Sequence, residues 1–326
     1  MPANLTPDYE RAEERLRQAA DDQERLSALR EMLATIPKHK GTEKMQADIK
    51  RRISQLSKAA AKKVHAKGFD PFHVPRGGAG QVVLVGLPNV GKSMLVAATT
   101  KAAVRVADYP FATAVPVPGM WKYHDVQIEL VDTPPVTPEN LPGGLLGTIR
   151  AADIVCLVVD AAADPLEQAE TMLGLLGGKG ITLFSVPRAQ LPPDAAGAHC
   201  GIVIATKVDI APRENVAALA ELYRGKVDVC PVSSLSGEGL DVLAERLWRM
   251  LAVIRVYTKQ PGKPPDRDRP FTLPAGATVE DLARQIHREL PEKMKFARIW
   301  GDGRFAGQQI HRTEPLHDKD IVEIHE

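Results

Sequence analysis

The sequence has few cysteines and no long apolar run. Its three cysteines, Cys156, Cys200 and Cys230, are scattered and form no Cys-x-x-Cys pair. They support neither a disulfide framework nor a zinc site, and they favour a reducing, cytoplasmic location. No uninterrupted segment reaches the roughly 20 apolar residues that a membrane-spanning helix needs, and residues 1–16 are charged. We therefore expect neither a membrane anchor nor a signal peptide.

The chain also lacks an excess of charge of one sign. Lys and Arg number 42 and Asp and Glu number 41, a net charge of +1, so a polyanion-binding surface has to be local. Hydrophobic residues at 44% and charged residues at 25% are ordinary values for a soluble globular protein. A length of 326 residues exceeds one ordinary core and predicts two or three domains.

The first expected unit covers residues 1–79 and is a helical hairpin followed by a linker. Between Asp8 and Lys67, apolar residues recur at helical spacing and predict two amphipathic helices. Pro37 and Gly41 separate the two stripes, which consist of Leu16, Ala20, Leu26, Leu29 and Leu33, and of Met45, Ile49, Ile53, Leu56 and Ala60. The prolines and glycines of residues 68–80 interrupt the helical period and indicate the linker.

The second and third expected units cover residues 80–252 and 253–326. In the second, short β-branched runs alternate with helical patterns, which predicts an α/β fold with a mostly parallel sheet covered by helices on both faces. The neighbourhood of residues 124–126 is a candidate hairpin. The third unit shows strand-like segments around one helical stretch, 279–290, which predicts a helix packed on a small mixed sheet. Trp121, Tyr123 and Trp300 lie in strand-like segments, so we expect them in the core.

A phosphate-binding loop follows the first apolar strand. The segment Gly86, Leu87, Pro88, Asn89, Val90, Gly91, Lys92, Ser93 fits the pattern G-x-x-x-x-G-K-[ST] between a strand and a helix. The glycines let backbone N–H groups converge on phosphate oxygens, the helix N-terminus adds a positive dipole end, and Lys92 supplies charge. Ser93 is a predicted Mg²⁺ ligand, and the predicted nucleotide contacts extend to Met94.

Two later strand ends indicate which base is recognised. Thr206, Lys207, Val208 and Asp209 follow the apolar strand 202–205, and a carboxylate there accepts hydrogen bonds from N1–H and the 2-amino group of guanine. Adenine offers no matching donors, so Asp209 predicts guanine, with the stem of Lys207 along the base plane. At the next strand end, Ser233, Ser234 and Leu235 are predicted to offer backbone N–H groups to the guanine carbonyl.

Two further residues are candidates for sensing the terminal phosphate. Asp132 follows the apolar segment 128–131 and is placed to hold a metal-bound water. Thr113 lies in the loop after the first helix of this unit, where its hydroxyl is a candidate Mg²⁺ ligand. We expect these two residues to form the nucleotide-dependent switch, although a helix cap at Asp132 and a solvated Thr113 are the simpler alternatives.

This ordered set of motifs resembles the Obg superfamily of GTPases, and in particular its developmentally regulated GTP-binding branch. The C-terminal unit is similar to that branch's TGS domain, a β-grasp unit, through the segments Ile254-Arg255-Val256-Tyr257-Thr258-Lys259, 278–282, 295–301 and 320–324. The resemblance implies GTP binding and hydrolysis, Mg²⁺, and association with the ribosome. Only 74 positions separate Asp132 from Thr206, which leaves no room for the domain that the branch inserts there.

Three residues near the expected terminal-phosphate site affect how far the hydrolysis mechanism of these GTPases applies to this chain. Pro135 stands where the resemblance implies a glycine whose N–H meets the γ-phosphate, and proline has no such donor. Val136 replaces the glutamine that orients the attacking water in Ras-like enzymes. Asn89 occupies the position that the resemblance assigns to holding a monovalent cation, so we expect K⁺-stimulated hydrolysis. Lys92, Asn89 and Thr113 are thus the expected catalytic residues.

One segment rich in lysine and arginine indicates a nucleic-acid partner. Residues 38–76 hold 11 lysines and arginines against three acids, a local balance of +8, which marks a candidate surface for ribosomal RNA. A solvated helix face is the alternative. The sequence therefore leaves two functions open: a slow GTPase that acts as a ribosome- or RNA-associated switch, favoured by Asn89, Thr113 and Asp132, and a nucleotide-binding scaffold with negligible turnover, favoured by Pro135.

Overall fold

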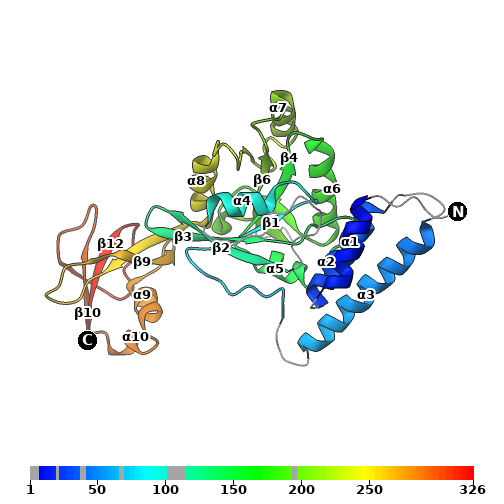
Figure 1. The fold of residues 1–326 in the computed structure, drawn as a ribbon. Helices are drawn as coiled ribbons and strands as arrows, with labels where there is room; N and C mark the ends of the chain where they lie inside the picture. Colours follow the sequence, from blue (N-terminus) through cyan, green and yellow to red (C-terminus); the bar gives the residue numbers. More distant parts are fainter. Residues whose placement is uncertain (1–6, 20–21, 37–41, 66–69, 101–114, 193–196) are drawn as a thin grey trace.

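The computed structural model describes residues 7–19, 22–36, 42–65, 70–100, 115–192 and 197–326, arranged as three successive parts (Figure 1). A group of helices comes first, an α/β layer structure follows, and a smaller sheet with its own helices forms the C-terminal part. Within the described residues, no helix combines the length and apolar character needed to cross a bilayer.

The described residues of the N-terminal part form three helices, so the predicted two-helix hairpin is wrong in number. They are α1 (Pro7–Gln18), α2 (Asp22–Thr35) and α3 (Glu43–His65), and α1 and α2 together take the place of the first expected helix. α2 begins at an aspartate, whose short side chain favours helix starts over helix interiors. Tyr9, Leu29 and Ile49, one from each helix, share a small core, and Arg15 binds the carboxylate of Glu31 at 3.0 Å.

The central part is a seven-stranded sheet in the order β2-β3-β1-β4-β6-β5, with β7 paired to β6. Among the strands that the structure describes here, only β2 runs antiparallel to its neighbour, which confirms the predicted mostly parallel α/β sheet. The predicted hairpin joins β2 to β3, with His124 at φ 52° in its turn. The strands are β1 (Gln81–Val85), β2 (Val117–Tyr123), β3 (Val126–Asp132), β4 (Ile154–Asp160), β5 (Thr182–Phe184), β6 (Ala198–Thr206) and β7 (Val229–Pro231).

Helices cover both faces of this sheet. The helices are α4 (Lys92–Thr99), α5 (Leu145–Ala151), α6 (Pro165–Gly178), α7 (Arg213–Leu222) and α8 (Leu240–Leu251), with the short η1 (Arg188–Gln190). Side chains alternate along each strand, so Val83 joins the core with α5, α6 and α7, and Val82 joins the core with α4 and α8. Because both faces are covered, every residue of β1 is buried.

The described residues between Asp132 and Thr206 form α5, β4, α6, β5 and η1, all of them parts of this layer structure. No inserted domain interrupts them over the described ranges 132–192 and 197–206, as the short spacing predicts.

The C-terminal part is a five-stranded sheet in the order β11-β10-β12-β8-β9, with helices packed on one face (Figure 1). The expected single helix ends at Ile286, and a four-residue helix follows, because Pro291 lacks the N–H that a continuing helix needs. The elements are β8 (Val253–Thr258), β9 (Asp266–Pro274), α9 (Val279–Ile286), α10 (Leu290–Lys293), β10 (Phe296–Trp300), β11 (Gln308–Ile310) and β12 (Asp320–His325).

A buried arginine joins the central and C-terminal parts. Arg255 on β8 binds Asp318 within its own part, at 2.6 Å, and Asp125 in the β2–β3 turn, at 2.8 Å. Tyr257 donates a hydrogen bond to the same Asp125 carboxylate, and the guanidinium of Arg255 lies 5.3 Å from the ring of Trp248 on α8. The β2–β3 hairpin thus carries Asp132 at the end of β3, and its turn is attached to the C-terminal sheet through Asp125.

Candidate nucleotide-binding site

The loop between β1 and α4 has the conformation that a phosphate-binding loop requires. Asn89 and Gly91 both have positive φ, 62° and 93°, which turns the backbone so that Lys92 begins the helix. A Cβ on Gly86 would lie 2.4 Å from the carbonyl oxygen of Val158 on β4, so only glycine fits there. Val90 is buried and Asn89 is exposed.

Lys92 lies inside this loop rather than in solvent. Its Nζ donates hydrogen bonds to the carbonyl oxygens of Gly86 at 2.9 Å and Leu87 at 2.8 Å, and the residue is 5% exposed. Burial lowers the pKa of Lys92 to about 8, although the nearby Asp132 carboxylate favours the charged form. The Lys92 ammonium is therefore held inside the phosphate-binding loop, where it can bind an anion.

The lowered pKa predicts a pH-dependent nucleotide affinity. A bound phosphate stabilises the charged ammonium, so binding above pH 8 must take up a proton. We expect GDP affinity to fall by about fourfold between pH 7 and pH 8.5, as the charged fraction of Lys92 declines. Titration calorimetry in buffers of different ionisation enthalpy measures the proton uptake. In Lys92→Arg, which stays charged, any remaining affinity should not change with pH, and a flat wild-type profile would contradict the assignment.

Ser93 and Asp132 meet at the ends of α4 and β3. Ser93 Oγ donates a hydrogen bond to Asp132 Oδ2 at 2.6 Å, and Asp132 is fully buried. A hydroxyl beside a carboxylate is a donor set that fits Mg²⁺, which takes one or two protein oxygens and completes its shell with water and phosphate oxygens. Asp132 ends β3 and caps no helix, so the alternative of a helix cap is wrong. Thr113 lies outside the described residues.

The residues after Asp132 are fixed to β1 and its loop. Thr133 Oγ1 donates to the carbonyl oxygen of Leu84 at 2.6 Å, and the N–H of Val136 donates to that of Gly86 at 3.1 Å. Pro135 is buried, and Val136 is 0% exposed within the sheet's core. The first N–H after Pro135 is therefore already engaged, and the Val136 side chain is enclosed in the core.

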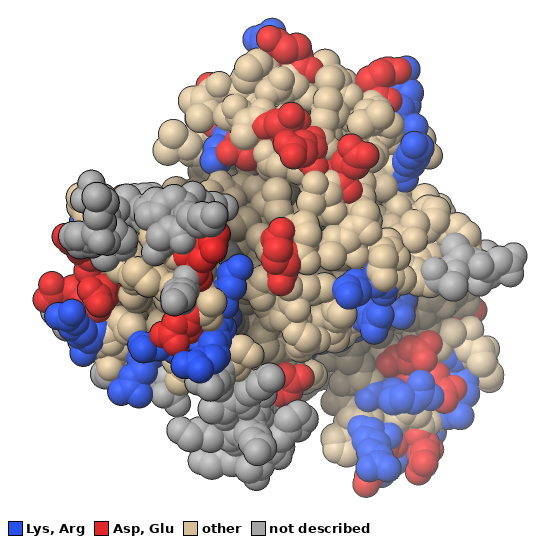
Figure 2. All heavy atoms as spheres, turned by 90° about the vertical axis from the view of Figure 1, so that its right-hand side faces the viewer, with Lys and Arg blue, Asp and Glu red and all other residues tan. Residues whose placement is uncertain are grey.

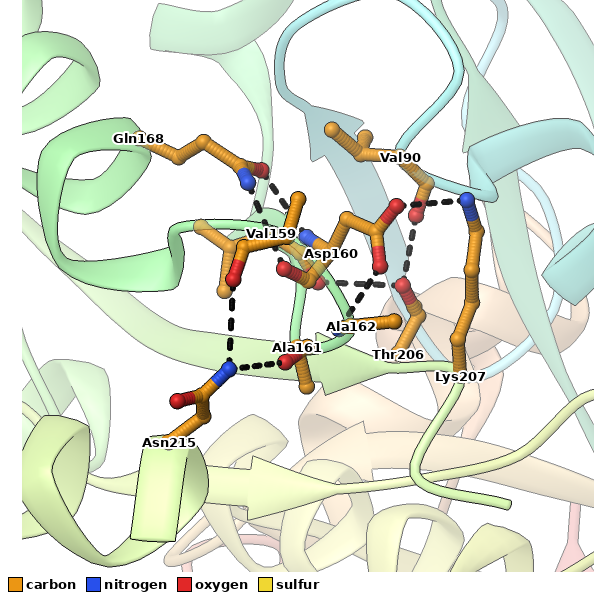
Figure 3. A network of polar contacts seen from close by, with 10 residues as sticks. Val90, Val159, Asp160, Ala161, Ala162, Gln168, Thr206, Lys207 and Asn215 are labelled. Atoms are coloured by element: carbon orange, nitrogen blue, oxygen red, sulfur yellow. Dashed lines mark hydrogen bonds and ion pairs between the residues drawn. The ribbon is translucent and has the colours of Figure 1, made fainter. Parts of the chain in front are cut away.

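The end of β6 contacts the phosphate loop directly (Figure 3). Thr206 Oγ1 lies 2.6 Å from the carbonyl oxygen of Val90 and 3.0 Å from that of Val159. Lys207, at φ 60°, extends toward the loop, and its Nζ binds Asp160 Oδ2 at 2.6 Å. The Thr206 hydroxyl thus holds the end of β6 against the phosphate-binding loop.

The two predicted base-reading loops lie side by side. The N–H of Val208 donates to the carbonyl oxygen of Val232, which places residues 206–209 beside residues 233–235. Asp209 is exposed. Ser233 is buried, and its Oγ accepts hydrogen bonds from the N–H groups of Leu235 at 3.2 Å and of Ser236 at 3.1 Å, which shapes the loop. Ser234 is half-buried, and the Leu235 side chain is 84% exposed.

Three residues of this region were missed from the sequence. Asp160 ends β4 in register with Thr206, accepts the Lys207 ammonium, and accepts the N–H of Ala162 (Figure 3). Gln168 and Asn215 bind the backbone of the same loop, at Asp160 and at Ala161 and Ala163. Asp160 could have been found, because it is a polar residue at the carboxyl end of a buried parallel strand. Nothing in the sequence points to Gln168 or Asn215.

Among the side chains that the structure describes, the basic segment 38–76 supplies only part of the predicted RNA-binding surface. Arg51 and Arg52 both pair with Asp48, and Arg76 pairs with Asp153 at 3.0 Å. Lys50 is exposed. On the side of the molecule seen in Figure 2, basic and acidic side chains are intermixed. Lys38, Lys40 and Lys67 lie outside the described residues, and the side chains of Lys44, Lys58, Lys62 and Lys63 are likewise not described.

Comparisons with known proteins agree with this geometry. Residues 81–185 match the family of 50S ribosome-binding GTPases, and residues 254–326 match the TGS domain. The chain is 28% identical to an uncharacterised GTP-binding protein of Halobacterium salinarum, over 93% of this chain and 98% of that protein. It is 27% identical to developmentally regulated G-protein 2 of Arabidopsis thaliana, over 92% and 90% of the two chains. It is 26% identical to human developmentally regulated GTP-binding protein 2, over 92% and 98%.

These alignments run over 364, 365 and 366 residues, more than this chain has, so the relatives carry residues that it lacks. The resemblance to the developmentally regulated GTP-binding branch is confirmed over almost the whole chain. The chain thus matches the 50S ribosome-binding GTPase family over residues 81–185 and the TGS domain over residues 254–326, and along almost its whole length it is similar to developmentally regulated GTP-binding proteins.

Proposed function

We propose that the chain binds GTP and GDP with Mg²⁺, hydrolyses GTP slowly, and acts as a ribosome- or RNA-associated switch. We propose further that it is divided into three domains, residues 1–79, 80–252 and 253–326. The observation that carries the proposal is the hydrogen bond between Thr206 Oγ1 and the carbonyl oxygen of Val90. It fixes the base-reading loop against the phosphate loop, so that one nucleotide spans both. The adjacent Ser93 and Asp132 supply the oxygens for the ion that accompanies the phosphates.

Each side chain then has a definite task. Residues 86–94 surround the phosphates, with Pro88 and Met94 at the margins of the loop and Lys92 supplying charge. Asp209 reads the guanine edge, Lys207 lies along the base, and Thr206 holds the two loops together. Ser233, Ser234 and Leu235 form the loop beside the base carbonyl. Mg²⁺ would be held by Ser93, Thr113 and Asp132, and it would supply positive charge against the phosphates.

Slow hydrolysis follows from what surrounds the terminal phosphate. Val136 is buried in the core and carries no group that could orient a water molecule. Charge at the transition state would then have to come from Lys92, from Mg²⁺ and from a monovalent cation at the exposed Asn89. The anchored Pro135–Val136 segment favours the second candidate, a scaffold that binds nucleotide with negligible turnover.

Hydrolysis measured in two salts separates these candidates. We expect phosphate release from GTP to be faster in KCl than in NaCl at equal ionic strength, because the resemblance assigns Asn89 to a monovalent-cation site at which K⁺ stimulates hydrolysis. Asn89→Ala should remove the difference, whereas Asn215→Ala, an amide that binds another loop, should retain it. GDP binding without phosphate release in either salt would establish the scaffold, and equal rates in both salts would exclude the role of Asn89.

RNA association is the second half of the proposal. It is supported by the match to the 50S ribosome-binding GTPase family and by the positive balance of residues 38–76. The relatives match over 92–93% of this chain, so the TGS domain is included in the proposed contact.

A further inference from the structure

An ion pair holds the lysine that the proposed function places along the base. Lys207 follows the end of β6 at φ 60°, a left-handed conformation that residues other than glycine seldom adopt and that persists only where surrounding contacts fix it. The N–H groups of Ile210 and Ala211 both donate to the Lys207 carbonyl oxygen at 3.1 Å. At the other end of the side chain, Lys207 Nζ lies 2.6 Å from Asp160 Oδ2 (Figure 3). Backbone and ammonium are thus both held.

Asp160 uses both oxygens of its carboxylate. Oδ2 accepts the Lys207 ammonium, and Oδ1 accepts the N–H of Ala162 at 2.9 Å, in the loop that follows β4. The side chain of Asp160 is 15% exposed and that of Lys207 is 36% exposed. An ion pair shielded from water in this way is stronger than one between two fully exposed side chains. Lys207 is therefore held in one position, whereas a surface lysine has many.

The position of Asp160 is itself fixed by its neighbours. Asp160 lies opposite Thr206 in the β4–β6 register, and the N–H of Ala161 donates to the Thr206 carbonyl oxygen at 3.0 Å. The side-chain oxygen of Gln168 on α6 accepts the N–H of Asp160 at 2.9 Å, and Asn215 on α7 donates to the carbonyl oxygen of Ala161 at 2.8 Å. Amide side chains of two helices thus brace the segment from which the carboxylate reaches the lysine (Figure 3).

A lysine that is held in place favours the binding of a flat ligand. A free lysine has several rotatable side-chain bonds, and ordering them when a ligand binds lowers the affinity. In Lys207 the contact with Asp160 orders these bonds within the protein itself. The apolar stem can then pack on the face of a base while the charged end stays engaged, as the stems of long charged side chains do on other apolar surfaces.

We propose that Asp160 is a positioning residue for guanine nucleotides: it fixes the Lys207 stem against the base and thereby sets how slowly the nucleotide dissociates. Asp160 acts through Lys207 and needs no contact of its own with the nucleotide. The inference rests on the nucleotide binding proposed above and adds to it a residue that controls residence time. The alternative is that Asp160 only shapes its own loop through the N–H of Ala162.

The test measures dissociation of a fluorescent GDP from the full-length protein, chased with unlabelled GDP in a stopped-flow instrument. Asp160→Asn keeps an oxygen that can accept the N–H of Ala162 but removes the charge that holds Lys207, so it should speed dissociation by about tenfold. Lys207→Met keeps an apolar stem without the ammonium and should have a similar effect. Adding Asp160→Asn to Lys207→Met should change the rate by less than about twofold, because the two residues act as one unit.

Pyrophosphate gives a readout on which the base has no influence. It occupies the phosphate-binding loop alone, so its affinity, measured by competition with fluorescent GDP, should be the same in the wild type and in both single variants. Asp164→Asn is the matched control. It changes an exposed carboxylate of the same loop, which caps α6 by accepting the N–H of Glu167, and asparagine caps helices equally well. Its GDP dissociation should match that of the wild type.

Wild-type dissociation rates in Asp160→Asn would overturn the positioning role, and so would a further acceleration when Asp160→Asn is added to Lys207→Met. A parallel loss of pyrophosphate affinity would also overturn it, since Asp160 would then support the loops in general. A wild-type protein that binds no GDP would instead contradict the proposed nucleotide site on which the inference rests.

Discussion

Asp209→Asn should convert a guanine nucleotide site into a xanthine nucleotide site. In the proposed function the carboxylate accepts two hydrogen bonds from guanine, and hydrogen bonds to a charged group contribute about 1.5–3 kcal/mol each. Asparagine would place an amide donor against the 2-amino donor of guanine. We therefore expect GDP affinity to fall by at least about 100-fold. Xanthine carries a carbonyl at that position, so the same amide should accept from N1–H and donate to the new oxygen.

Competition between fluorescent GDP and unlabelled XDP measures this exchange. Asp209 is exposed, so the substitution should leave the melting temperature unchanged. Glu214→Gln is the matched control, because it removes an exposed carboxylate on the neighbouring helix α7 and should keep the preference for GDP. Equal loss of GDP and XDP binding in Asp209→Asn would mean that the residue shapes the loop rather than reads the base.

The phosphate loop and the positions of the central strands along the chain could be predicted from the sequence because local rules determine them. A strand followed by Gly86, Gly91, Lys92 and Ser93 leaves the backbone few alternatives, and continuous apolar runs such as β1 arise only where both faces of a strand are covered. The same holds for Asp132 and Thr206, which stand directly at the ends of buried strands.

What could not be predicted depends on contacts between distant segments. The pairing of Lys207 with Asp160 joins residues 47 positions apart, and the contact of Thr206 with Val90 joins residues 116 apart. The division between α1 and α2 was also missed, because the apolar period continues across it although the helix does not. Likewise, strand alternation identifies two faces of β10, but only the register and the helices decide which face remains open.

Pro135 is expected to remove the preference for GTP over GDP, and restoring an N–H at this position should restore it. The resemblance places a donor to the γ-phosphate here, and proline has none. The neighbouring Val136 N–H cannot replace it, since it is bound to the carbonyl oxygen of Gly86 while its side chain is fixed in the core. The wild type should therefore bind GDP and a non-hydrolysable GTP analogue with similar affinity.

Pro135→Ala and Pro135→Gly both supply the missing donor, and each should raise the affinity for the analogue relative to GDP by about 10- to 100-fold, the equivalent of one hydrogen bond to a charged oxygen. Pro134→Ala adds an N–H one residue earlier in the same buried segment and should leave the ratio unchanged. An increase in Pro135→Gly alone would indicate that flexibility matters rather than the donor, because alanine offers the same N–H with less backbone freedom. A wild-type protein that already prefers the analogue by tenfold would show that another part of the chain senses the γ-phosphate. The three variants thus separate the loss of a single donor from the rigidity of the segment that carries it.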